Sequence, residues 1–351
     1  MSAACALSPS PSPSVTVAPS ARGAAGSGLR AVPPESPPSV RVGMPQLDAG
    51  GLSEGWLLRD AGDRHWEAIG RRLGVATDEI RGEAGERLYP TVVAVRARYQ
   101  APLAVVREND LLELAAEVVP CGRACAHGRV TAVVGATGAR FALELLTTFA
   151  ARAEGGRGGL RRAPPEPTLA RDWLPVGPAP AIATLARAAR RGEPLCDAFS
   201  GPVLALPDRP LAELTYEPSP YADYNGAGLL YFASYVTIAD SVERQMVRQL
   251  RLDRQSRDSS CPADWALATS AVRRDVFYYD NLPLGASLTA TLRSFASDGH
   301  EVTTHVRFCR AGDPAAAGTP RAAAGPRPMA DIVTRRRFVD RSVDRRVGDR
   351  R

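Results

Sequence analysis

The chain has 351 residues and contains no lysine, since all 44 of its basic residues are arginine. The length allows two domains or one large one. The missing lysine excludes a Schiff-base lysine, a pyridoxal phosphate anchor and a P-loop lysine. The net charge of +6 depends on an arginine-rich tail at residues 339–351, in which arginine alternates with aspartate. A solvated tail is therefore favoured over nucleic-acid binding.

The six cysteines are scattered, and only Cys121 and Cys125 lie close together. No second pair follows at zinc-site spacing, so the pattern indicates reduced thiols and no metal site. The sequence has no signal-peptide pattern, and no apolar stretch is long enough to span a bilayer. We therefore expect a cytoplasmic protein that binds neither membranes nor nucleic acid.

Residues 1–43 are rich in serine, proline, alanine and glycine. Such a composition predicts a disordered arm, or an upstream start codon with Met44 as the true start. Glycines then precede a helical pattern that runs to Gly74. Alternating apolar residues predict strands at 91–100, 110–119 and 128–134, with a fourth candidate at 141–149. Residues 44–152 are expected to form the first unit.

A second and more apolar helical pattern runs from Tyr224 to Arg244, opened by Asn225, Gly226 and Gly228. A helix that is apolar on all sides is a buried one, and this apolar run is too short to cross a bilayer. Strand patterns follow at 272–308, with a last strand candidate at 330–338. A central helix wrapped by an antiparallel sheet is the hotdog arrangement.

The two halves correspond weakly, because helix starts and strands recur in the same order at a roughly constant offset. Residues 153–198, rich in glycine, arginine and proline, are expected to be a linker with a short helix. Residues 199–338 are expected to be the second unit. The predicted fold is therefore α+β, a double hotdog in one polypeptide, with a homodimer left open.

Two glycine motifs have simpler interpretations than catalysis. Residues 51–55 match G-x-S-x-G, but no strand precedes them, so Ser53 is better explained as a helix cap or a polar lining group. Residues 133–138 resemble a dinucleotide-binding turn, but a hairpin turn is the better interpretation. Among the histidines, His127 and His300 are expected in solvated hairpin turns, and no Cys/His cluster has metal-ligand spacing.

Two predicted helix starts, Gly51–Ser53 and Asn225–Gly228, offer free backbone N–H groups that stabilise an anion. For a thioester carbonyl such a site is an oxyanion hole. The simpler alternative is that these glycines only let each helix enter the sheet. Because the feature recurs in both halves and Asn225 adds a donor, we favour function. Tyr89 is either a core residue or a residue at the mouth of a cleft.

Several long segments resemble the leinamycin-pathway LnmK family. They are MPQL, GLSEGWLLRDAGDRHW, RLYPTVVAV, YNGAGLLYFASYVTIAD and ADIVTRRRF, which lie between Met44 and Phe338. The resemblance implies a double-hotdog enzyme of polyketide biosynthesis, an acyltransferase and decarboxylase. Such an enzyme converts methylmalonyl-CoA to an acyl group that it loads on an acyl carrier protein. It uses no cofactor beyond the coenzyme A thioester itself.

Under this resemblance Tyr89 is the acylated nucleophile, and Asn225 and Gly226 stabilise the enolate oxygen. Gly51, Ser53, Thr91 and Gly228 are expected to contact the substrate. Two rivals remain open. One is an acyl-CoA thioesterase, which needs a carboxylate to activate water, with Asp223 and Glu54 as candidates. The other is a non-catalytic module that binds acyl thioesters.

Overall fold

The computed structural model of the chain describes residues 38–153, 159–169, 173, 175, 177–193, 195, 209–254, 265–312 and 328–339. The expected tail after residue 339, most of the expected arm and parts of the expected linker lie outside these residues. The first half contains β1 (Ser39–Arg41), η1 (Met44–Gln46), β2 (Leu47–Asp48), β3 (Gly51–Leu52), α1 (Glu54–Leu73), η2 (Thr77–Glu79), β4 (Tyr89–Tyr99), η3 (Leu103–Val105), β5 (Leu111–Gly122), β6 (Cys125–Val134), β7 (Arg140–Arg152) and β8 (Leu160–Arg162). The second half contains α2 (Ala181–Arg190), β9 (Ala212–Tyr216), α3 (Phe232–Arg254), α4 (Trp265–Ala268), β10 (Thr269–Tyr278), β11 (Leu288–Ser297), β12 (Glu301–Arg310) and β13 (Pro328–Phe338).

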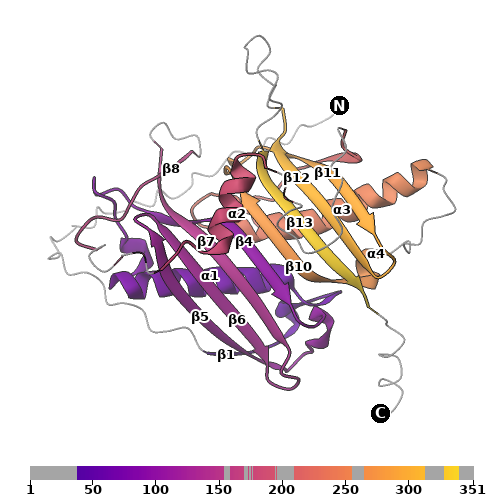
Figure 1. Cartoon of the computed structure of the whole chain (residues 1–351), viewed down its shortest axis with the longest axis horizontal. Helices are drawn as coiled ribbons and strands as arrows, with labels where there is room; N and C mark the ends of the chain where they lie inside the picture. Colours follow the sequence, from indigo (N-terminus) through magenta and orange to yellow (C-terminus); the bar gives the residue numbers. More distant parts are fainter. Residues whose placement is uncertain are drawn as a thin grey trace, which may run out of the picture.

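One antiparallel sheet of 11 strands dominates the molecule (Figure 1). Its order is β1-β5-β6-β7-β4-β10-β13-β12-β11-β9, with β8 added beside β7. Counted outward from the pair β4–β10, the first half contributes β4, β7, β6, β5 and β1, and the second half contributes β10, β13, β12, β11 and β9 in the corresponding positions. The halves meet where β4 pairs with β10, from Arg98↔Arg273 to Ala94↔Phe277, and we call this junction the seam. The structure confirms the predicted α+β double hotdog fold.

The first central helix, α1, begins as its sequence predicts. Ser53 is the N-cap, and its hydroxyl accepts a hydrogen bond from the Trp56 N–H over 3.4 Å. The helix ends at Gly74, whose φ of 73° is the left-handed conformation that glycine adopts without strain. Gly62 lies against α3, because a Cβ there would come within 2.7 Å of the Phe232 ring. The two central helices therefore cross closely.

The second central helix, α3, is buried as predicted, with Ala233, Val236, Ala239 and Val242 fully inaccessible to solvent. Its predicted start at Asn225 is wrong, since the helix begins at Phe232. The Asn225 side chain accepts hydrogen bonds from the N–H groups of Ala227 and Leu229, which holds a turn in place of a first helical turn. The residues before α3 therefore form a loop.

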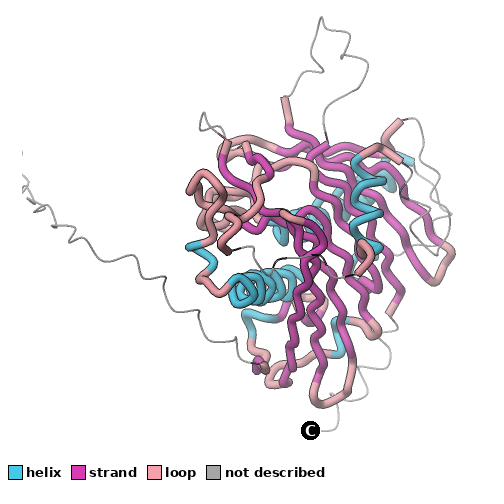
Figure 2. The backbone as a smooth tube through the Cα atoms, turned by 60° about the vertical axis from the view of Figure 1, so that its left-hand side comes forward, coloured by secondary structure: helices cyan, strands magenta, loops and turns pink. Residues whose placement is uncertain are grey.

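The opposite face of the sheet carries α2 (Figures 1 and 2). Ile182 and Ala189 of α2 are buried against Ala94 of β4, Leu146 of β7 and Phe277 of β10. The helix thus lies over the seam, on the face that α1 and α3 leave uncovered. The segment expected as a linker therefore contributes both α2 and the strand β8 to the fold.

Two further expectations differ from the structure. Residues 39–41 belong to the expected arm, yet they form β1 and pair with β5, and the next residue, Val42, is only 1% exposed. The fold thus begins before Met44. His127 was expected in a solvated turn, but it lies within β6 and is buried. The strand continues through it because His127 pairs with Val119 of β5 and with Leu146 of β7. No helix in the described ranges is long and apolar enough to cross a membrane.

Candidate functional site

A cavity of about 610 Å³ lies at one end of the seam, and we call it the seam cavity. The last paired residues there are Ala94 and Phe277. Beyond this pair β4 continues toward Tyr89 beside β7, whereas β10 stays beside β13 to Tyr278. The two strands separate, and residues of both line the space between them. The cavity is bounded by the start of β4, the end of β10, one side of α2 and the start of α3.

The floor of the cavity is formed by the loop before α3 and by the first turn of that helix. Leu230, Phe232 and Tyr235 line it. Tyr278 at the end of β10 fixes this turn, because its hydroxyl donates to the Phe232 carbonyl over 2.8 Å. A helix N-terminus stabilises negative charge. The predicted anion-stabilising end of the second helix therefore borders the cavity, although it lies at Phe232 and not at Gly226.

Asn225 lines the cavity, but its side-chain oxygen is engaged within the loop. Gly226 and Gly228 are placed in the same loop and not on the cavity wall. Gly228 adopts a φ of 66°, which the tight turn requires. The predicted Asn225–Gly228 group thus shapes the entrance to α3, and only the Asn225 amide reaches the cavity.

Tyr89 lies at the start of β4 and is half-buried at the cavity wall. Two guanidinium groups flank its ring: the Cζ atom of Arg87 is 4.9 Å from the ring centroid and that of Arg152 is 5.9 Å away. Thr91, two residues further along β4, also lines the cavity, and its hydroxyl donates to the Tyr89 carbonyl over 3.2 Å. The structure therefore brings together Tyr89, Thr91 and Asn225 of the predicted site.

Asp280 and Asn281, which sequence analysis missed, follow β10 and line the cavity opposite Tyr89's strand. The Asn281 side chain binds the backbone of Leu230: it accepts a hydrogen bond from the Leu230 N–H over 3.2 Å and donates one to the Leu230 carbonyl over 3.3 Å. Asp280 accepts a hydrogen bond from the Asn281 N–H over 2.8 Å and is otherwise exposed. It is the acidic residue among those that line the cavity. The signal available in the sequence was a polar pair directly after an apolar strand.

The deeper tyrosines of the cavity are protonated groups. Burial, and then the nearby Asp63 carboxylate, raise the pKa of Tyr231 to about 12. Burial also raises the pKa of Tyr235 and of Tyr278 well above the usual value. These phenols therefore stay protonated at neutral pH and are not nucleophiles. The Tyr278 hydroxyl donates to the Phe232 carbonyl, whereas the buried Tyr235 hydroxyl has no hydrogen-bond partner in the described structure.

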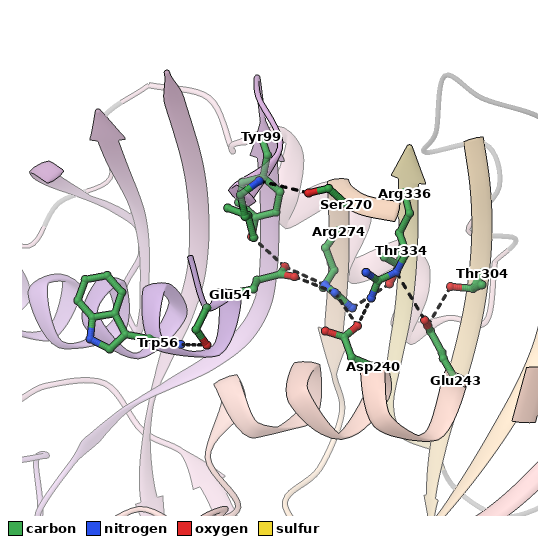
Figure 3. Close-up of polar contacts among 12 residues, drawn as sticks. Glu54, Trp56, Tyr99, Asp240, Glu243, Ser270, Arg274, Thr304, Thr334 and Arg336 are labelled. Carbon is green, nitrogen blue, oxygen red and sulfur yellow. Dashed lines mark hydrogen bonds and ion pairs between the residues drawn. The ribbon is translucent and has the colours of Figure 1, made fainter. Parts of the chain in front are cut away.

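The corresponding end of the seam, beside the start of α1, is occupied by a network of ion pairs and hydrogen bonds (Figure 3). The Arg274 guanidinium donates to both carboxylate oxygens of Glu54 and to Asp240, each over 2.8 Å. Tyr99 donates to Glu54 over 2.8 Å, as Tyr278 donates to Phe232 at the open end. The buried charges are paired and hydrogen-bonded, which is the condition for tolerating them in a core.

Gly51 and Ser53, predicted to contact substrate, lie at this end of the seam. A Cβ on Gly51 would come within 2.4 Å of Ala104 Cα, so the glycine is needed for close packing against η3. The backbone N–H of Leu103 in η3 donates a hydrogen bond to the Ser270 hydroxyl over 3.2 Å. The two carboxylates considered for a thioesterase are also engaged away from the cavity. The Glu54 carboxylate accepts hydrogen bonds from Arg274, and the Asp223 carboxylate accepts one from the Ser219 N–H over 2.8 Å.

No metal-binding group of three or more His, Cys, Asp or Glu side chains occurs within the described part of the chain. Cys121 and Cys125, which were expected to be reduced thiols, also line the cavity.

Comparison with known proteins identifies the fold. No protein-family model and no curated protein sequence matches the chain. Among solved structures, the chain is similar to the 12:0-ACP thioesterase from Umbellularia californica, with a TM-score of 0.55 and 10% identity over 86% of this chain and 96% of that one. It is also similar to an acyl-ACP thioesterase from Bacteroides thetaiotaomicron, with a TM-score of 0.52 and 12% identity over 85% and 96% of the two chains. At these identities the likeness establishes the hotdog fold.

Proposed function

We propose that the protein is an enzyme that cleaves acyl thioesters, with the acyl group held in the seam cavity. The observation that carries this proposal is the opening of the sheet at the N-terminus of α3. There an apolar cavity, a helix start and a carboxylate come together. Ligand sites of this kind are concave and mostly apolar, with a few convergent polar groups. The acyl-ACP thioesterases with the same fold support the proposal.

The rim of the cavity fits a substrate with a phosphate-bearing arm. Arg162, Arg187 and Arg190 line the cavity and are exposed, and Arg87 and Arg152 flank Tyr89 beside them. Asp280 is the only acidic residue among the lining residues. Guanidinium groups bind phosphate oxygens through paired hydrogen bonds. Coenzyme A and the phosphopantetheine arm of a carrier protein both carry such phosphates.

The chemistry follows from the placement of the polar groups. Negative charge that develops on the thioester oxygen would be stabilised by the N-terminus of α3 at Phe232. Asp280 is exposed at the cavity and bears a carboxylate that can take a proton from water. The products are a carboxylic acid and a free thiol, and the reaction needs no cofactor.

A panel of acyl-CoA and acyl-carrier thioesters tests this proposal, with loss of thioester and release of thiol followed by chromatography. Asp280→Asn keeps the side-chain shape and should lower the hydrolysis rate about 100-fold or more. Glu108→Gln changes an exposed carboxylate that does not line the cavity and should leave the rate unchanged. Binding of acyl-CoA without any cleavage would contradict the proposal and favour a non-catalytic binding module.

A second candidate is acyl transfer with decarboxylation, the activity of the LnmK family. Tyr89 favours it, because its ring lies on the cavity wall beside the guanidinium groups of Arg87 and Arg152, which can hold the phosphates of a coenzyme A thioester. Tyr89 would then take the acyl group from methylmalonyl-CoA after loss of carbon dioxide, and pass it to an acyl carrier protein.

Mass spectrometry distinguishes this second candidate from hydrolysis. Incubation with methylmalonyl-CoA should add a propionyl mass to the native protein and none to Tyr89→Phe, with carrier loading lost in parallel. The Phe variant preserves the ring between its two arginines. Native carrier loading by Tyr89→Phe would show that the tyrosine only shapes the cavity.

A further inference from the structure

One hydroxyl group in the wall of the seam cavity has no hydrogen-bond partner. It belongs to Tyr235, which lines the cavity and is only 1% exposed. Within the described part of the chain, no group donates a hydrogen bond to this hydroxyl or accepts one from it. Buried polar atoms of folded proteins are nearly always hydrogen-bonded, and leaving one unpaired costs stability. An unpaired hydroxyl beside a cavity therefore indicates a group that bonds to a ligand.

The position of Tyr235 directs this hydroxyl toward the start of α3. Tyr235 lies in the first turn of the helix, which begins at Phe232. Side chains on a helix lean toward its N-terminus. Two aromatic rings hold the ring of Tyr235, whose centroid lies 5.4 Å from that of Tyr278 and 5.8 Å from that of Phe308, both edge to face. The hydroxyl is therefore fixed in place before any substrate binds.

The hydroxyl also lies within electrostatic reach of Asp280, the carboxylate proposed to activate water. Burial raises the pKa of Tyr235 well above the usual value of a phenol, and the charge of Asp280 raises it further. Tyr235 therefore stays protonated and can donate a hydrogen bond without releasing its proton. The neighbouring Tyr278 cannot serve in the same way, because its hydroxyl already donates to the Phe232 carbonyl over 2.8 Å.

We propose that Tyr235 is a catalytic residue whose hydroxyl donates a hydrogen bond to the thioester oxygen. This inference rests on the proposed function. As water attacks the carbonyl carbon, Asp280 takes a proton from it and negative charge develops on the carbonyl oxygen. The Tyr235 hydroxyl and the N-terminus of α3 together stabilise that charge. The carbonyl bond then forms again, the carbon–sulfur bond breaks, and Asp280 passes the proton to the departing sulfur, which leaves a carboxylic acid and a free thiol.

Thermal unfolding of two conservative variants tests whether the hydroxyl is free in the folded protein. Tyr235→Phe keeps the ring between Tyr278 and Phe308 and removes a hydroxyl without a partner in the described structure, so its melting temperature should equal or exceed the native value. Tyr278→Phe removes a bonded hydroxyl at the same helix turn and should melt at a lower temperature. A similar loss in both variants would show that Tyr235 has a structural partner, such as a buried water, and would overturn the proposal.

Steady-state kinetics on the thioester panel tests the catalytic role. Tyr235→Phe should lower kcat about 100-fold and leave KM nearly unchanged, because the hydroxyl stabilises charge that is present only in the transition state. A raised KM with native kcat would show that the hydroxyl only binds the substrate, and native kinetics would show that it only lines the cavity. Either result overturns the inference while the proposed function stands. If the native protein cleaves no thioester, the proposed function and this inference both fail.

Discussion

Acidification should weaken this protein through His65, a residue in the middle of α1. Its Nε2 lies 3.0 Å from the Thr147 hydroxyl, which itself donates to the Ala126 carbonyl. Nε2 therefore carries the proton, and the buried Nδ1 has no hydrogen-bond partner in the described structure. A second proton on Nδ1 would place a buried charge against Gly128, whose added Cβ would come within 2.0 Å of that nitrogen. Burial, and then the nearby His127, lower the pKa of His65 from 6.5 to about 3.

The sign and size of the effect follow from these two values. The unfolded chain binds a proton at His65 below pH 6.5, whereas the folded chain does so only near pH 3, so stability is full above pH 6.5 and falls as the pH drops toward 3. The slope approaches ~1.4 kcal/mol per pH unit, which gives a loss of about 2 kcal/mol between pH 7.5 and pH 5.

Urea unfolding at these two pH values measures this loss. Other ionisable groups of the chain also respond to the change in pH. The test is therefore the difference between the native protein and His65→Gln, which cannot take up the proton. We expect the variant to lose about 2 kcal/mol less than the native protein between the two pH values. His300→Gln, at an exposed turn, should follow the native curve. Parallel curves for native protein and His65→Gln would refute the reasoning.

Three further predictions concern packing and charge. Arg274→Met leaves the buried Glu54 without its cation and should cost about 3–5 kcal/mol in urea unfolding. Arg191→Met, at an exposed ion pair, should leave the unfolding curve nearly unchanged, and similar losses for both variants would contradict a buried network. Gly128→Ala should cost about 1–3 kcal/mol through its clash with His65, whereas Gly226→Ala, with no atom within 4 Å of the added Cβ, should be nearly neutral; equal melting temperatures would show that His65 moves aside. A chain starting at Met44 lacks β1 and the buried Val42, so it should melt below a chain starting at Pro38 and lose about 1.5–3 kcal/mol; identical melting curves would show that β1 does not stabilise the fold.

The fold could be predicted because its signals are local. Alternation along β4 to β7 and the apolar run of α3 each need only a few neighbouring residues to be recognised. The start of α3 could not be located in the same way, because the apolar Leu229 and Leu230 fit a helix equally well. What decides it is the side chain of Asn225, which holds the preceding turn, and that of Asn281, which binds Leu230 from the loop after β10, 51 positions along the chain.

The candidate site depends on long-range register even more strongly. Tyr89, Thr91 and Asn225 could be identified as site candidates from their segments. Nothing near Ala94 or Phe277 indicates that their pair is the last one across the seam, because the end of pairing is set by how the two halves dock. Asp280 follows β10 beyond that last pair, so its place on the cavity wall depends on a pairing that is not visible in the sequence.

The two ends of the seam share one tyrosine contact and differ in the first residue of the central helix. In each half a tyrosine at the end of the seam strand donates to the first turn of a central helix, Tyr99 to Glu54 and Tyr278 to the Phe232 carbonyl. At the α1 end the first helical residue is a carboxylate, and a buried carboxylate needs a cation in contact with it. Arg274 supplies that cation and occupies the space beside the helix. At the α3 end the first residue is Phe232, which needs no counterion, and the space beside it remains as the seam cavity. The two ends of the seam thus differ at the first residue of the central helix, which is Glu54 paired with Arg274 at one end and Phe232 beside the seam cavity at the other.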